Sequence, residues 1–160
     1  MAQKATGPVP PGMHTLTTHL WFGGDCEAAV AFYAKAFGAE LACPLAKGPG
    51  GKGVMHAMLQ IGDAQLMLAD AWPGAWEQAP AGSATGGVHI YVADCDALFE
   101  RATEAGCEVI FPMTDMFWGD RMGKVKDPYG HCWGIATHTW DYTPEELAKG
   151  QEEWLASMKG

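Results

Sequence analysis

One pattern occurs twice in the sequence, as HLWFGGDCEAAVAFYAKAFGAEL (residues 19–41) and as HIYVADCDALFERATEAGCEV (residues 89–109). Each copy begins with a histidine and a short apolar strand, and continues with an Asp-Cys pair and a helix with apolar spacing. A glycine then ends the helix before a second strand. The two copies start 70 residues apart (89 − 19). This distance predicts two duplicated halves rather than a solenoid of short units.

The pattern around these copies predicts the same element order in both halves. Asp25 and Asp94 are suited to cap the two helix N-termini, and Gly38 and Gly106 to end the helices. Three strands are expected after each helix, over residues 40–44, 54–61 and 64–69 in the first half and 108–111, 123–127 and 132–138 in the second. The order β-α-β-β-β, found twice, predicts an α+β fold built from two βαβββ modules.

The domain organisation follows from the same pattern. A Pro/Gly-rich leader over residues 1–14 is expected to be flexible, and residues 15–140 are expected to form a single domain. Within this domain, module 1 covers about 15–70, a linker covers 71–86 and module 2 covers about 87–140. Thr143, Pro144 and two glutamates then open a C-terminal helix within residues 141–160.

Composition narrows the function classes. The net charge of −9 argues against a nucleic-acid partner, because an acidic protein repels phosphate backbones. No apolar run approaches the roughly 20 residues of a membrane span, so no membrane partner is expected. Five cysteines, an odd number without any CxxC pair, favour reduced thiols and a cytoplasmic location.

Four motifs together resemble a known family. They are FGGDCEAAVAFYAKAFGAE, MHAMLQIGDAQLMLAD, YVADCDALFERATEAG and FWGDRMGKVKDPYGHCWGIATH. They resemble the glyoxalase/bleomycin-resistance/dioxygenase superfamily, also called vicinal oxygen chelate (VOC) proteins, and within it a phosphonate-operon-B-like or demethylubiquinone-methyltransferase-like bacterial subgroup. The resemblance implies that the sheets of the two modules curl around a cup-shaped cavity, and that the protein is a homodimer.

The resemblance also implies where a metal would bind. Metal-dependent members place ligands on the first and last strand of each half, with His or Gln and Glu from one half and His and Glu from the other. His19 and His89 match the two histidine positions, and Gly134 stands where a glutamate is expected. The strand over residues 64–69 has no glutamate either. His19, His56 and His89 therefore remain the metal-ligand candidates, for zinc, nickel, iron or manganese, and three neutral histidines without a metal are the favoured interpretation.

Strand alternation gives an independent prediction of the cavity lining. Apolar residues at alternate positions are expected to face the helix, which turns His19 and Trp21, His89 and Tyr91, and His56 toward the cup. His56 is also the candidate for moving a proton, because an imidazole titrates near neutral pH.

The loop over residues 117–121 adds two further candidates. Trp118 and Arg121 are expected to close over a ligand, with Arg121 gripping an anionic group. The complete set of predicted substrate-binding residues is then His19, Trp21, His56, His89, Tyr91, Trp118 and Arg121.

Two function classes stay open at this point. The favoured hypothesis is a protein that binds a small molecule in a His/Trp-lined cavity without the usual four-ligand metal site. The alternative is a metal-dependent VOC enzyme, a lyase, isomerase or dioxygenase, acting on a carbonyl or catechol-like substrate. The missing carboxylates favour the first hypothesis, and the sequence does not decide whether the protein is an enzyme.

Overall fold

The computed structural model describes residues 2–158 of the chain. Residues 1, 159 and 160, at the outer ends of the predicted leader and C-terminal helix, lie outside the described residues. The chain forms two compact units, Met1–Pro80 and Ala81–Gly160. Residues 2–14, the described part of the predicted leader, contain neither a helix nor a strand.

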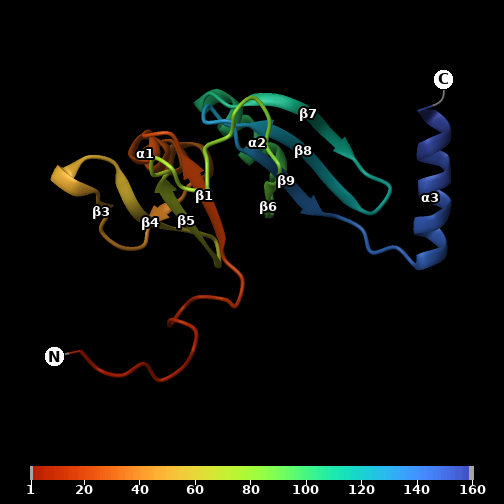
Figure 1. Ribbon diagram of the computed structural model, residues 1–160. Helices are drawn as coiled ribbons and strands as arrows, with labels where there is room; N and C mark the ends of the chain where they lie inside the picture. Colours follow the sequence, from red (N-terminus) through yellow and green to blue (C-terminus); the bar gives the residue numbers. More distant parts are fainter. Residues whose placement is uncertain (1, 159–160) are drawn as a thin grey trace. The chain divides into compact units, whose positions relative to one another are not determined.

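The first unit has a mixed sheet in which the first and last strands pair in parallel (Figure 1). Its elements are β1 (Thr18–Phe22), α1 (Cys26–Phe37), β2 (Glu40–Leu41), β3 (Ala46–Lys47), the 3-10 turn η1 (Pro49–Gly51), β4 (Val54–Ile61) and β5 (Ala64–Asp70). The strand order is β1-β5-β4-β2, and β3 also pairs with β4. All contacts among β5, β4, β2 and β3 are antiparallel.

The second unit repeats this arrangement. Its elements are β6 (Gly87–Tyr91), α2 (Cys95–Ala105), β7 (Glu108–Asp115), β8 (Asp120–Lys126), β9 (Cys132–His138) and α3 (Pro144–Ser157). The strand order is β6-β9-β8-β7, with β6 parallel to β9 and the other pairs antiparallel. The predicted α+β fold with two βαβββ modules is therefore confirmed.

Several predicted strand boundaries are wrong, and one of them is that of the strand expected over residues 108–111, which extends to Asp115. The strand expected over residues 40–44 ends after Leu41, although the N–H of Ala42 still donates to the carbonyl of Met58 in β4, and strand pairing resumes at Ala46. Pro44 lies in this gap and has no N–H to donate to a ladder. Residues 117–121 were expected to be a loop, but Asp120 and Arg121 already belong to β8.

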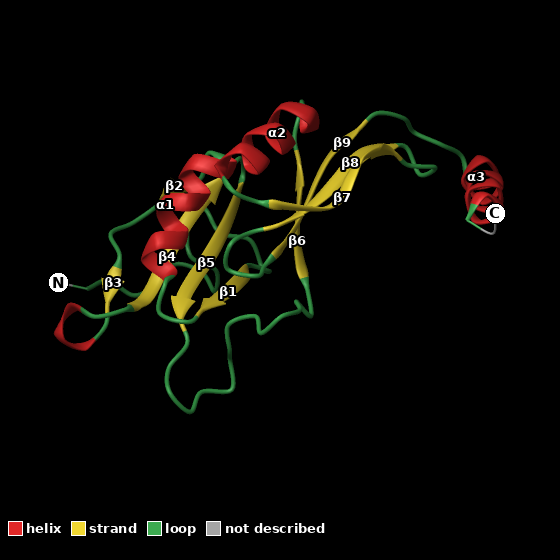
Figure 2. Cartoon of the chain, turned by 90° about the horizontal axis from the view of Figure 1, so that it is seen from above, coloured by secondary structure: helices red, strands yellow, loops and turns green. Residues whose placement is uncertain are grey.

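The helices α1 and α2 each cover one face of their own sheet, as the view in Figure 2 shows. In the first unit the covered face is apolar apart from Asp70, and its buried residues include Ala29 and Tyr33 of α1 and Leu59 and Leu68 of the sheet. In the second unit, Gly123 lets α2 approach closely, because a Cβ there would lie 2.6 Å from the ring of Phe99. The opposite face of each sheet, which no helix of its module covers, is called the open face below.

The N-terminus of α1 is held by a residue far away in sequence. The predicted cap Asp25 stands at the N-cap position, but its side chain makes no capping hydrogen bond. Instead, the backbone N–H groups of Gly24 and Cys26 donate to Oδ1 of Asp70, at 2.9 and 3.0 Å, and that of Val54 donates to Oδ2 at 2.8 Å. The buried Asp70 carboxylate thus joins β5, β4 and α1. In α2 the predicted cap is confirmed, since Asp94 accepts from the N–H of Ala97.

The C-terminal helix α3 is confirmed with its predicted cap. Thr143 and Glu146 form a capping box, in which each side chain accepts from the backbone N–H of the other. Figure 1 shows α3 beyond the β7–β8 loop, where Trp154 packs on Phe117 with ring centroids 5.8 Å apart. Among the described residues, no helix combines the length and the apolar character needed to cross a membrane.

Replacing Asp70 by Ala is expected to lower the free energy of unfolding by about 3 kcal/mol, because three buried or part-buried N–H groups lose their acceptor. Asp94→Ala is the matched control and should cost about 1 kcal/mol, since it frees one exposed N–H. Urea unfolding of both variants and of Asp25→Ala measures the difference. An Asp25→Ala variant as unstable as Asp70→Ala would contradict this account of the cap.

Candidate functional site

The register of the first sheet places the predicted residues of this unit on its open face. His19 lies opposite Met67 of β5, which lies opposite Met58 of β4. The neighbouring row, which contains Leu68 and Ala57, is buried against α1. Because strand side chains alternate between faces, His19 and Trp21 point away from the helix, as the sequence predicts. His56 shares this face, since it precedes Ala57 on β4.

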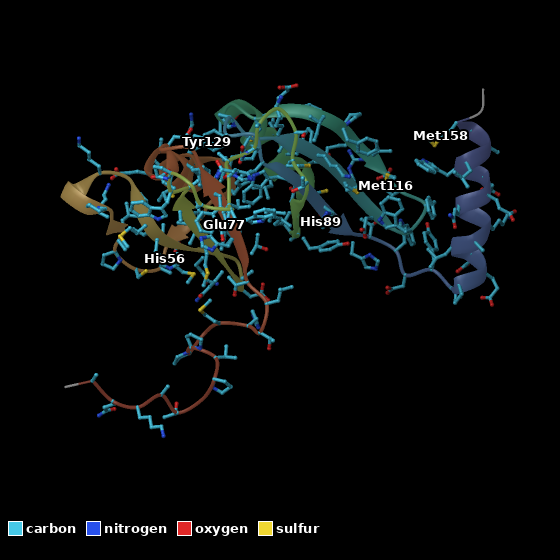
Figure 3. All side chains as sticks on the ribbon, viewed as in Figure 1. His56, Glu77, His89, Met116, Tyr129 and Met158 are labelled. Atoms are coloured by element: carbon cyan, nitrogen blue, oxygen red, sulfur yellow. The ribbon has the colours of Figure 1, made fainter. Side chains whose placement is uncertain are left out.

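His19 is the least satisfied polar side chain of the open face. Its ring stacks on Trp21 with centroids 4.3 Å apart, and the ring of His56 meets it edge-on at 6.4 Å. Its Nε2 atom is buried and has no hydrogen-bond partner among the described residues. Burial and the neighbouring His56 lower the pKa of His19 below 6.5, against a smaller opposing effect of Glu77. His19 is therefore mostly neutral at pH 7. Figure 3 labels His56 and Glu77.

The second sheet has a corresponding row on its open face. His89 lies opposite Gly134 of β9, which lies opposite Lys124 of β8. The ring of His89 leans over the glycine, because a Cβ at position 134 would lie 2.4 Å from His89 Nδ1. One row further along β6, the Tyr91 ring lies 4.8 Å from that of His89. His89, labelled in Figure 3, and Tyr91 thus have the orientation that the alternation predicts.

The space beside this row is a hollow of about 340 Å³. Its lining residues are Ala84, Thr85, Gly86, Gly87, Val88, His89, Lys124, Cys132 and Gly134. The hollow exists because the glycines at 86, 87 and 134 carry no side chains to fill it. Its polar side chains are those of Lys124, His89, Thr85 and Cys132.

A buried carboxylate organises the other end of this open face. Asp120 is only 3% exposed, and its Oδ2 accepts from the hydroxyl of Tyr91 at 2.8 Å and from the indole N–H of Trp118 at 2.9 Å. Nδ1 of His138 lies 2.7 Å from Oδ1, and Nε2 of the same ring lies 2.9 Å from Asp141. Hydrogen bonds from its three partners lower the pKa of Asp120 although burial opposes them. Asp141 and Asp120 raise the pKa of His138.

Asp120 and His138 are not in the set of substrate-binding residues predicted from the sequence. The signal was present, because the alternation that places Tyr91 on the open face also places His138 and Asp120 there. The strand was expected to start at residue 123, however, so Asp120 was counted with a loop. Trp118 and Tyr91 share this carboxylate as their acceptor, and the predicted role of Trp118 in closing over a ligand stays a prediction.

Arg121 faces the opposite way. On the helix side of the sheet, its guanidinium donates two hydrogen bonds to Asp96 of α2, both 2.7 Å long, and one to Asp115 at 3.1 Å. These ion pairs raise the pKa of Arg121. Its donors are engaged within the fold, and its predicted role in gripping a ligand stays a prediction.

The donor set does not fit the usual metal site of the resemblance. In the part of the chain that the structure describes, no group of three or more His, Cys, Asp or Glu side chains is placed to hold a metal ion. His19 and His56 form a pair without a carboxylate, and a divalent cation usually requires three or four protein ligands. The Asp120 carboxylate is occupied by its three hydrogen-bond donors.

The chain consists of two βαβββ halves, and in each half the first strand pairs in parallel with the last. Each first strand has a histidine and an aromatic residue on its open face. These features define a duplicated protein of the VOC fold. A sequence model of the Glyoxalase/Bleomycin resistance protein/Dioxygenase superfamily matches residues 14–135. The chain therefore belongs to this superfamily.

Relatives agree with this assignment without defining an activity. The chain is 38% identical over 131 residues to the uncharacterised protein Mb0911c of Mycobacterium bovis. This match covers 77% of the chain and 83% of Mb0911c. The structure of PA1353 from Pseudomonas aeruginosa matches with a TM-score of 0.63 and 25% identity, over 78% of this chain and 98% of the other. A PhnB protein from Bacillus cereus matches with a TM-score of 0.62, over 78% and 99% of the two chains, and its 16% identity shows the fold alone.

The pKa of His19 is expected to lie below 6.5 and the pKa of His138 above 6.5. His56→Gln should raise the pKa of His19, because it removes a neighbouring positive charge, and Asp141→Asn should lower that of His138. By linkage, protonated His138 stabilises the fold fully below about pH 6.5, and this contribution is lost as pH rises through its folded pKa. Neutral His19 has the opposite dependence, because the fold loses stability when this histidine must be protonated, as pH falls below about 6.5. NMR titration of the ring protons measures both pKa values. Two wild-type pKa values on the same side of 6.5 would contradict the prediction.

Proposed function

We propose that the protein binds a small organic molecule on the open faces of its sheets, without a four-ligand metal site. The observation that carries this proposal is the buried, unpartnered Nε2 of His19. A buried polar atom without a partner costs about 1–3 kcal/mol, and such groups need an explanation in a native structure. A ligand that offers a donor or an acceptor at this position supplies the missing partner.

The surroundings of His19 suit an organic ligand. Trp21 provides a stacked aromatic surface, and Met58 and Met67 provide flexible apolar contacts in the same row. A neutral imidazole beside such residues can bind a carbonyl, hydroxyl or amide group at little desolvation cost. This combination favours recognition over Lewis-acid chemistry.

The Asp120 network supports the same proposal in the second unit. Tyr91 is 61% exposed, yet its hydroxyl is fixed by a buried carboxylate. A fixed aromatic ring loses little conformational entropy when a ligand stacks on it. We infer that Tyr91 acts as a preformed contact surface, oriented by Asp120 and Trp118.

The finer assignments are part of this proposal. The phosphonate-operon-B-like subgroup is supported by the four sequence motifs and by one distant structural relative. A homodimer and a cytoplasmic location are proposed on the family resemblance and on the five free thiols. None of these assignments alters the test of ligand binding.

His19→Leu is expected to abolish ligand binding while leaving the free energy of unfolding unchanged or raising it by about 1 kcal/mol, because it removes an unpaired buried nitrogen. The measurement is a thermal-shift screen of a fragment library, followed by urea unfolding of the wild type and of His19→Leu. His14→Leu is the control, since His14 is exposed and precedes β1. A large loss of stability in His19→Leu would indicate a structural role instead.

Metal content decides between this proposal and its alternative. Untagged protein purified without chelators, and incubated with zinc, nickel, iron or manganese, should contain far less than one metal ion per chain by elemental mass spectrometry. Near-stoichiometric metal that is lost in His19→Ala and in His89→Ala would overturn the proposal. It would favour a metal-dependent enzyme acting on carbonyl or catechol-like substrates.

A further inference from the structure

We propose that the hollow on the open face of the second sheet selects ligands that carry an anionic group, a carboxylate or a phosphate, held by Lys124 and His89. This inference rests on the proposed function and adds the chemical class of the ligand. The hollow belongs to the second unit alone, so its chemistry follows from β6, β8, β9 and the segment before β6.

The row Lys124–Gly134–His89 supplies the geometry. These residues are direct neighbours on three adjacent strands, so about 10 Å separates the outer two backbones, given a strand spacing of about 4.8 Å. Gly134 between them has no side chain, and the His89 ring leans into that space. An anionic group in the hollow, between the His89 ring and the side chain of Lys124, can therefore accept from the ammonium of Lys124 and from the imidazole of His89. The hydroxyl of Thr85 lines the same hollow.

The local charge is opposite to that of the whole chain. The chain carries 19 acidic and 10 basic residues, yet the lining of the hollow contains a lysine and a histidine and no Asp or Glu. Four other basic side chains of the described residues form ion pairs: Lys47 with Glu27, Arg121 with Asp96 and Asp115, Lys126 with Glu108, and Lys149 with Glu153. No such ion pair is formed by Lys124 within residues 2–158. Selection for an anion must then come from close contacts, because the net charge of −9 works against it at long range.

The first unit shows that the fold does not require this lysine or this glycine. In the matching row of the first sheet, His19 lies beside Met67 and Met58. The two rows share the histidine and differ at the other two positions, where the first unit has apolar side chains. The shared fold therefore does not explain the lysine and the glycine at these positions. Binding of an anion beside Lys124 and His89 accounts for both residues.

The test uses three probes with one carbon skeleton: 3-phenylpropionate, 3-phenylpropan-1-ol and 3-phenylpropylamine. Each is titrated into the full-length protein and followed by ¹H–¹⁵N NMR at the amides of Gly86, Gly87 and Gly134. The carboxylate should bind more tightly than the alcohol and the amine, with saturable shifts at these glycines. Lys124→Met should weaken carboxylate binding about tenfold, as expected for one charge-assisted hydrogen bond.

Lys126→Met is the matched control. It removes the same charge two residues along the same strand, outside the lining of the hollow, and should change carboxylate binding less than about twofold. Gly134→Ala keeps the charge but displaces the His89 ring, and should also weaken binding. Both lysines are accessible on the strand, so the variants are expected to fold, and their thermal unfolding verifies this.

Three outcomes would overturn the inference. They are equal binding of carboxylate and alcohol, equal effects of Lys124→Met and Lys126→Met, and no saturable shift with the carboxylate. None of them removes the proposed function, which fails on separate results: a fragment library that yields no ligand dependent on His19, or near-stoichiometric metal held by His19 and His89. A carboxylate that binds selectively through Lys124 in a protein whose His19→Leu variant behaves as wild type would support this inference and overturn the role of His19.

Discussion

In each half of the molecule the first strand pairs in parallel with the last, and the positions of the open-face side chains follow from this pairing. A parallel pair needs a crossover connection, which contains α1 in the first half and α2 in the second, and this helix covers one face of the sheet. The helix start must be held to the strand ends. Asp70 does this in the first half, and the hydroxyl of Thr137, which accepts from the N–H of Cys95, does it in the second.

The sequence predicts this architecture well because it depends on local signals. Alternation along β1 and β6 is enough to assign His19 and His89 to the open face, and the helix stop at Gly38 is visible as a left-handed glycine. The contributions of Asp70 and Asp120 could not be predicted in the same way. Asp70 acts on Cys26 across 44 residues, and Asp120 acts on Tyr91 across 29, so neither partner is visible in a local window.

Asp120 and His19 are two polar side chains on the open faces that differ in how their buried atoms are hydrogen-bonded. Asp120 is buried with three donors, so its charge is compensated within the fold and the surrounding rings are fixed. His19 is partly buried with one nitrogen unpaired, so the fold carries a cost there that packing does not recover. Natural proteins keep such local conflicts mainly where function requires them. The contrast supports the proposal that His19 contacts a ligand, while Asp120 orients the side chains around it.

The comparison of the two rows also explains why a metal site of the superfamily type does not fit. The resemblance places a glutamate at position 134, but a side chain there would meet His89 Nδ1 at 2.4 Å. The matching position of the first half is Met67, again without a carboxylate. The residue opposite the first-strand histidine is thus a methionine in one half and a glycine in the other, and neither offers a carboxylate. The methionine adds an apolar side chain to its open face, and the glycine lines the hollow beside Lys124. The lack of a carboxylate beside the histidine and the character of each open face therefore depend on the same pair of positions.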